Sequence, residues 1–300
     1  MALLACIVAA GCLSPRSSDG PAPDLGGPEY SALMVSSDLA QGTNRVEFAL
    51  VDRNNMPVGA SQATVIPRYT TSGADEPQQR EAQTATFLPW PPQGSGRGVF
   101  ITTIDFDVPG EATAENPGLW ELQISADIPS GQRVEAVTAV RVATEPSTPA
   151  IGAAAPRSVT PTAAQAPDLS HITSAFKPDP EFYQLSVHEA LDEPEPLVVL
   201  FSTPAFCVSA TCGPQLEILA QMKEQYRSRV NFIHVEVFED PHLIEGSRFN
   251  ARHVPSVDEW GLPTEPWTFI VDGDGLVRAK FEQFTPLEVL EAALEQVLEG

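Results

Sequence analysis

The strongest constraint on how this chain folds is a short apolar run at residues 197–201, which leads into a pair of cysteines, Cys207 and Cys212. A run of this length, bounded by turn residues, is typical of a strand that is buried on both faces. Apolar residues at helical spacing follow over residues 215–226. The stretch therefore predicts a strand, a cysteine pair and the N-terminus of a helix in direct succession.

The position of this cysteine pair favours redox chemistry. Backbone N–H groups and the positive end of the helix macrodipole stabilise a thiolate relative to a thiol, and the thiolate is the nucleophile in disulfide exchange. The other two of the 4 cysteines, Cys6 and Cys12, lie in an N-terminal segment that we expect to be cut or modified. The remaining pair is therefore a redox couple or a local staple, not a disulfide framework.

Length and charge limit the classes of function. A chain of 300 residues, 42% of them apolar, can fill the cores of two domains. Its formal net charge of −23 argues against nucleic acid as a partner, because a protein that binds phosphate needs clustered Lys and Arg. The same charge argues against electrostatic docking on anionic lipid. We interpret the acidity chiefly as a contribution to solubility.

The N-terminus carries the pattern of an export signal. Residues 1–11 form an apolar run that is too short to cross a bilayer and ends in small residues, as in a signal-peptide h-region. Together with Cys12, the run resembles the lipobox of bacterial lipoproteins. That resemblance implies lipid on Cys12 and an extracytoplasmic protein anchored to the bacterial membrane. We assign residues 1–29 to this signal and a polar tether; no Lys or Arg precedes the run, which leaves an upstream start open.

Residues 30–143 have the period-two pattern of an all-β domain, with alternation that is clear at residues 46–50 and 119–126. Helical periodicity is weak and Gly and Pro mark the turns, so we expect a β-sandwich. The block contains no cysteine or histidine. Its methionines, Met34 and Met56, are expected to pack rather than to bind copper.

Two phrases in this block, at residues 37–45 and 117–122, resemble the immunoglobulin-like YtkA-type domains of bacterial envelope proteins. The resemblance implies an N-terminal immunoglobulin-like sandwich. Because the block offers no set of catalytic side chains, we expect it to serve as a spacer or an interaction module.

A Pro- and Ala-rich linker is predicted at residues 144–177, with His171 as a solvated side chain within it.

Residues 178–300 then have an α/β pattern. We expect His234 on the polar face of a strand, and His188 and His242 at the surface. The predicted elements are a helix at 181–191, strands at 197–202, 231–238, 266–271 and 276–284, a turn at 272–275, and a last helix capped by Thr285 with Pro286 at its first position.

This order of elements is similar to that of a thioredoxin-like domain, over residues 178–300. Residues 197–201 look like the strand before the family's active site, and Phe206 stands at the aromatic position before the family's first cysteine. The segment that begins at Pro266 looks like the loop whose cis proline faces the disulfide. The resemblance therefore implies a cis bond between Glu265 and Pro266.

The resemblance also implies an activity, a thiol–disulfide oxidoreductase with Cys207, Cys212 and Pro266 as its site residues and without a cofactor. Its partners would be protein thiols or disulfides of the cell envelope. The Cys207 thiolate, as the more exposed thiol with the lower pKa, would attack a partner disulfide. Cys212 would then release the mixed disulfide held against Pro266.

Two departures from the family pattern keep other functions open. Four residues separate the cysteines instead of two, and Leu200 stands where many thioredoxins bury an acid. One alternative is a copper chaperone in which Cys207 and Cys212 bind the metal together with a distant histidine such as His253. The other alternative is a lipoprotein without catalytic activity, in which the pair forms a structural disulfide.

Overall fold

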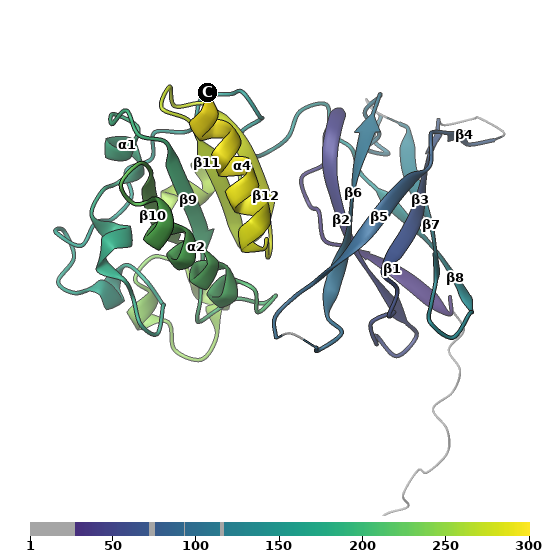
Figure 1. Cartoon of the computed structure of the whole chain (residues 1–300), viewed down its shortest axis with the longest axis horizontal. Helices are drawn as coiled ribbons and strands as arrows, with labels where there is room; N and C mark the ends of the chain where they lie inside the picture. The colour runs from purple at the N-terminus through teal and green to yellow at the C-terminus, as the bar shows by residue number, and fades with distance from the viewer. Residues whose placement is uncertain (1–27, 72–75, 93, 115–116) are drawn as a thin grey trace, which may run out of the picture.

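The computed structural model describes residues 28–71, 76–92, 94–114 and 117–300, so the predicted lipidation site Cys12 lies outside the described residues. The described chain forms an antiparallel β region with an eight-stranded sheet and an α/β region with a four-stranded sheet, which lie beside one another (Figure 1). Within this part of the chain, no helix is long and apolar enough to cross a membrane.

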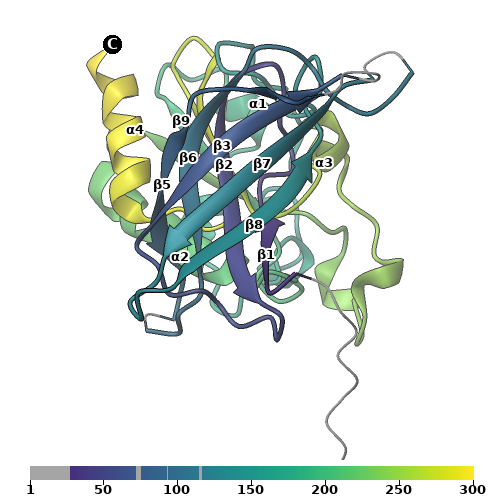
Figure 2. The ribbon, with the colours of Figure 1, turned by 90° about the vertical axis from the view of Figure 1, so that its right-hand side faces the viewer.

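The N-terminal β region is one curled sheet. Its eight strands pair antiparallel and are β1 (Tyr30–Met34), β2 (Gly42–Asp52), β3 (Gln62–Thr70), β4 (Gln78–Gln79), β5 (Gln83–Pro89), β6 (Gly98–Phe106), β7 (Leu119–Asp127) and β8 (Arg133–Val140). The order is β1-β2-β6-β5-β3-β7-β8, with β4 paired to β3. Because β1 also approaches β8, the sheet is nearly closed and resembles a barrel (Figure 2).

Alternating side chains build the core of this region. Along β7, Trp120, Leu122 and Ile124 are fully buried, whereas Gln123 is exposed. A strand that turns one face to the core and the other to water shows this period of two. The predicted β character of residues 30–143 is therefore confirmed. Met34 packs against the core as expected, but Met56 is 61% exposed, because it lies in a turn after β2, so the packing predicted for Met56 is wrong.

The C-terminal α/β region is built on a mixed sheet of four strands, β9 (Leu197–Ser202), β10 (Asn231–Glu236), β11 (Trp267–Val271) and β12 (Val277–Glu282). Their order is β10-β9-β11-β12. The β10–β9 pair is parallel, and the other two pairs are antiparallel. Every residue of β9 is buried, as the apolar run predicts for a strand covered on both faces.

Helices cover both faces of this mixed sheet. On one face, α2 (Cys212–Tyr226) and α4 (Leu287–Glu299) pack against β9 and β11. On the other face, α1 (Val187–Ala190) and α3 (Pro255–Glu259) pack against β9 and β10. Four short 3-10 helices complete the described part of this region, η1 (Leu169–His171), η2 (Pro180–Tyr183), η3 (Pro241–Leu243) and η4 (Arg248–Asn250).

Two local predictions in this region need correction. The helix expected at residues 181–191 is divided into η2 and α1, because Ser186 forms a capping box with Glu189 and starts a new helix. Thr285 does not cap α4, whose N-cap position is Pro286. Thr285 is fully buried, and its backbone N–H donates to Gln215 Oε1 at 2.8 Å. Thr285 is therefore bound to a side chain of α2 and does not cap α4.

The segment 144–177, predicted as a linker, follows an irregular path along the C-terminal region. The Ala155 N–H donates to the Gly275 carbonyl at 2.9 Å, and the Thr160 N–H donates to Ser186 Oγ at 2.7 Å. Thr160 is buried by this contact. The segment is thus packed along most of its course, and its role as a boundary between two domains stays a prediction.

Polar and apolar contacts join the two regions. The Ser37 N–H and Oγ donate to the Glu282 carboxylate at 2.8 and 2.6 Å. Next to this contact, Lys280 Nζ donates to Asp38 Oδ2 at 3.2 Å. An apolar cluster of Trp90, Val99 and Phe284 lies in the same interface. The end of β12 is therefore in direct contact with the β region.

Candidate dithiol site

Cys207 and Cys212 lie where the sequence predicts, in the loop between β9 and the start of α2. They form a disulfide with their Cα atoms 5.9 Å apart. Cys212 is the first residue of α2 and is fully buried, whereas Cys207 is partly exposed. The two sulfur atoms therefore differ in access to solvent, in the direction that the sequence predicts.

The Cys207 sulfur lies at the N-terminus of α2. The backbone N–H of Cys212, the first of the helix, donates to Cys207 Sγ at 3.3 Å, and Ser209 Oγ lies 3.3 Å from the same sulfur. Ser209 Oγ is in turn 2.7 Å from Thr211 Oγ1. Because the free N–H groups of a helix end carry partial positive charge, this position stabilises a thiolate on Cys207 once the disulfide is reduced.

Gln283, which follows β12, joins the start of α2 to the loop that contains Pro266. The bond between Glu265 and Pro266 is cis, as the family resemblance implies. Thr211 Oγ1 donates to Gln283 Oε1 at 3.0 Å, and Gln283 Nε2 donates to the Glu265 carbonyl at 2.9 Å. The Gln283 N–H also donates to the Pro266 carbonyl at 2.8 Å. Hydrogen bonds through one side chain thus connect the residue before Cys212 with the Pro266 loop.

Nothing in the sequence points to Gln283, because a glutamine at the end of a strand carries no motif. Its backbone has a φ of 60°, in the left-handed region that a residue other than Gly seldom adopts. The residue is 7% exposed, and the hydrogen-bond partners of its side chain are distant in sequence. Only the packing of β12 against the loop shows what it does.

His234 is buried, so its predicted place on a polar strand face is wrong. Its residue is 2% exposed, with Tyr183 Oη 2.7 Å from Nδ1 and Ser202 Oγ 2.9 Å from Nε2. The pKa of His234 is lowered to about 4, because burial disfavours the charged ring. His234 belongs to β10, which is the edge strand of the sheet, and η2 packs against this strand.

Glu236 is a buried carboxyl at the same end of the sheet as the dithiol. It pairs in register with Ser202 on β9, and its Oε2 accepts the Ser174 N–H at 2.8 Å. Ser174 Oγ accepts the Ala205 N–H at 3.1 Å, two residues before Cys207. Burial raises the pKa of Glu236 above its ordinary value. In β9, the strand that precedes the cysteines, Leu200 is buried at the position where many thioredoxins have an acid. The buried acid of this protein, Glu236, lies instead on the neighbouring strand β10.

The structure does not bring His253 into a metal site with the cysteines. Among the described residues, the group of His, Cys, Asp and Glu side chains that could hold a metal comprises His171, Asp240 and His242. The exposed His253 ring instead lies against Phe238, with 5.2 Å between ring centroids. The copper alternative built on Cys207, Cys212 and His253 therefore lacks an assembled ligand set.

The N-terminal region contacts the dithiol loop directly. Arg97 Nη2 donates to the carbonyl of Ser209 at 3.1 Å. Trp90 and Phe284 pack in one cluster that also includes Ile218 of α2. The loop between β5 and β6 therefore lies at one side of the cysteine pair.

Comparisons with known proteins do not identify a family. No family model matches the chain, and no curated protein matches it. Among solved structures, MtrC from Shewanella baltica OS185 is 17% identical over 39% of this chain and 22% of its own length, with a TM-score of 0.25. A cohesin module of the family 33 glycoside hydrolase from Clostridium perfringens ATCC13124 is 11% identical over 39% of this chain and 98% of the module, with a TM-score of 0.20. Similarities at these scores do not establish a shared fold or activity.

Proposed function

We propose that this protein is a thiol–disulfide oxidoreductase of the cell envelope, with a C-terminal domain similar to thioredoxin and an N-terminal immunoglobulin-like domain. The single observation that carries the proposal is the asymmetry of the cysteine pair. Cys207 is partly exposed and its sulfur accepts the first N–H of α2, whereas Cys212 is fully buried. An attacking thiolate needs access and a nearby positive potential, and Cys207 has both.

The proposed reaction is a two-step exchange that starts from the reduced pair. The Cys207 thiolate attacks one sulfur of a partner disulfide, so that an intermolecular S–S bond forms, the partner bond breaks and one partner thiolate leaves. Cys212 then loses its proton to solvent and attacks the sulfur of Cys207. The intramolecular disulfide forms, the second partner thiolate leaves, and the partner has gained two electrons from the pair. The reverse sequence oxidises a partner dithiol.

Residues around the pair would position these steps. Gln283 joins Thr211 to the loop of Pro266, so it would hold that loop in place while a mixed disulfide lies against it. Ser174 and Glu236 fix the chain before Cys207 from the other side. These hydrogen bonds support a site in which the cysteine loop and the Pro266 loop keep one relative geometry, as a functional site requires.

The proposal includes a location and a role for the first half of the chain. The signal-like run that ends at Cys12 supports a lipid anchor on an extracytoplasmic face of a bacterial membrane. The β region would act as a spacer or interaction module, and its contact between Arg97 and Ser209 would limit the approach of a partner from that side. Mass spectrometry of the mature N-terminus tests the lipid on Cys12.

Trapping with oxidised glutathione tests the exchange. In the reduced Cys212→Ser variant, Cys207 should form a stable adduct with glutathione, because the resolving thiol is missing. In the Cys207→Ser variant, the buried Cys212 should react at least about tenfold more slowly. The Cys207→Ser, Cys212→Ser double variant is the matched control, because any adduct that it forms comes from glutathione reacting at another residue. Equilibration of the unmodified protein with glutathione buffers should give a reduction potential above about −300 mV.

A structural disulfide would give a different set of results. Both single variants would then lose a similar amount of stability, about 2 kcal/mol for so short a loop. The reduction potential would lie below about −300 mV. Such a potential, or a Cys212 that reacts as fast as Cys207, would overturn the proposal.

A further inference from the structure

We propose that His171, Asp240 and His242 form a binding site for one divalent transition-metal ion of the zinc, copper and nickel group. Their potential ligand atoms all lie within 4.8 Å of one another. The two imidazole rings come from separate short helices, η1 and η3, and their centroids are 3.7 Å apart. This site is distinct from the cysteine pair and does not depend on the proposed redox function.

The donor set selects the class of metal. Two imidazole nitrogens and one carboxylate oxygen suit zinc, copper(II) and nickel(II), which accept nitrogen ligands readily. Magnesium and calcium prefer sites made only of oxygen ligands. Three protein ligands also leave a coordination position for water or for a small ligand, as in catalytic zinc sites. His171 is partly exposed, and Asp240 and His242 are exposed, so an ion has access from solvent.

A second carboxylate lies beside the imidazoles. Asp168 caps η1, and its Oδ1 accepts from the Ser170 N–H at 2.8 Å and from Ser170 Oγ at 2.5 Å. Its Oδ2 is 3.9 Å from His171 Nε2. Carboxylates next to metal-binding imidazoles orient the ring and strengthen binding, and Asp168 is placed for this role.

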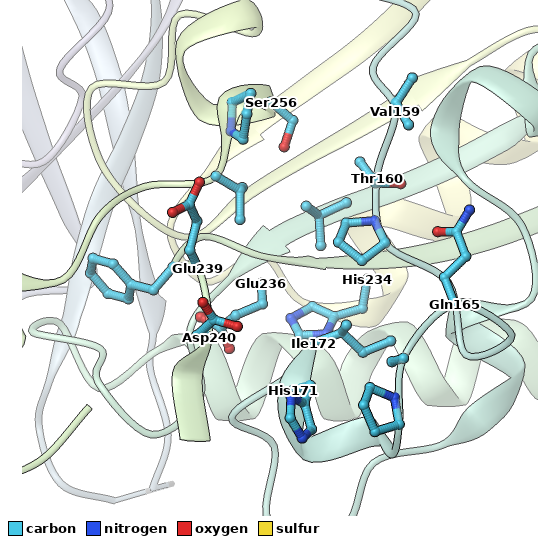
Figure 3. Close-up of a pocket in the computed structure, with 17 residues that line it drawn as sticks. Val159, Thr160, Gln165, His171, Ile172, His234, Glu236, Glu239, Asp240 and Ser256 are labelled. Carbon is cyan, nitrogen blue, oxygen red and sulfur yellow. The ribbon is translucent and has the colours of Figure 1, made fainter. Parts of the chain in front are cut away.

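The site opens on a cavity. The cavity has a volume of about 490 Å³, and its lining includes His171, Asp240, His234 and Glu236. Figure 3 shows Glu236, Glu239 and Asp240 on one side of this cavity and Gln165 on the other. A water or small ligand bound to the metal would lie at the wall of this cavity, since His171 and Asp240 both line it.

Zinc titration of the full chain tests the site. The protein, freed of metal with a chelator, should bind one equivalent of Zn²⁺ by calorimetry at pH 7.5, whereas Mg²⁺ should not bind. His171→Ala and His242→Ala should each weaken Zn²⁺ binding at least about 100-fold, since each removes one of three ligands, and Asp168→Asn should weaken it about tenfold. His188→Ala is the matched control, because His188 is partly exposed and contacts Ser186 instead of this cluster.

Two further measurements separate this site from others and from loss of fold. The Cys207→Ser, Cys212→Ser double variant should retain the full Zn²⁺ affinity. The NMR signals of His171 and His242 should shift on Zn²⁺ addition, and those of His188 should not. Binding that survives in His171→Ala and His242→Ala with unchanged circular dichroism, binding that disappears with the cysteines, or the absence of Zn²⁺ binding at millimolar concentration would each overturn the proposal.

Discussion

The N-terminal β region and the C-terminal α/β region bury their strands in different ways. In β8 of the first region, buried and exposed residues largely alternate, so the strand shields one face only. In β9 of the second region, all six residues are buried, because helices cover both faces. The buried strand has no exposed face for polar groups. Its polar residues therefore gather at its carboxyl end, where Ser202 and Thr203 precede the cysteines.

The difference explains why the candidate chemistry lies in one region. Residues 30–143 contain no cysteine or histidine, whereas all five histidines and the Cys207–Cys212 pair belong to the second half of the chain. The carboxyl ends of the parallel strands β9 and β10 bring together the dithiol loop and Glu236. Ligand sites of α/β sheets commonly occupy this end of parallel strands. The β region instead contacts the dithiol loop through Arg97.

The largest expected effect comes from truncating one aromatic side chain in each core. Trp120 in the β region and Phe201 in the α/β region are both fully buried, and each packs against two further aromatic rings. Trp120→Ala and Phe201→Ala should each cost about 3–5 kcal/mol of unfolding free energy. Denaturation followed by circular dichroism reports the β sheet, and the reactivity of the buried Cys212 thiol after reduction reports the α/β region.

These two variants also test whether the regions fold independently. If residues 30–143 are a separate domain, Trp120→Ala will lower the unfolding transition of the β sheet and leave the protection of the cysteine pair unchanged. Phe201→Ala will have the opposite pattern. A single transition that both variants lower equally would show that the interface through Glu282 and Phe284 makes one cooperative unit.

A smaller effect is expected from the pH dependence of stability, where buried Glu47 and His234 act in opposite directions. Burial raises the pKa of Glu47 to about 7, although Arg45 Nε donates to its carboxylate at 2.6 Å and favours the charged form, and nearby Glu282 adds to the increase. Between about pH 4.5 and 7 the folded state therefore holds more protons on Glu47 than the unfolded state does. Stability should fall through this window as pH rises, by at most about 3 kcal/mol. Glu47→Gln should remove this slope in urea unfolding.

His234 provides the opposing half of the same measurement. Its pKa of about 4 in the folded state lies below the ordinary value of 6.5, so the unfolded state binds more protons between these two pH values. Stability should therefore fall as pH decreases through this window, again by at most about 3 kcal/mol. The difference between the unmodified protein and His234→Gln isolates this contribution. If Glu47→Gln and His234→Gln changed the slope of stability against pH in the same direction, the predicted opposition between Glu47 and His234 would be wrong.

The smallest expected effect concerns the contact of the β region with the dithiol loop. Arg97 is exposed, and its hydrogen bond to the Ser209 carbonyl is open to water. Arg97→Ala should change the unfolding free energy by less than about 0.5 kcal/mol. It should alter the rate at which a small reagent alkylates reduced Cys207 by less than about twofold. A much larger increase in that rate would show that the β region controls access to the cysteine pair.

Much of the local structure follows from the sequence alone. The strand at residues 197–202 has the predicted bounds, and the strand at 119–127 extends the predicted alternation at 119–126 by one residue. The turn after β11 also forms as expected, with the Asp272 side chain accepting from the backbone of Asp274 and Leu276. Apolar periodicity and turn chemistry act between residues that are close in the chain, so a linear pattern records them.

The surroundings of both candidate sites depend on the tertiary structure. Gln283 bonds to Thr211 across 72 positions of the chain, and Ser174 bonds to Glu236 across 62. His171 and His242, each expected to be a surface residue, meet because η1 lies against η3. The sequence by itself determined the cysteine pair, its strand and its helix, because these are neighbours in the chain. Only the tertiary structure decided which distant polar side chains surround that pair and which form the histidine cluster. It did so by pairing β9 with β10 and β11 and by packing the segment before residue 178 against that sheet.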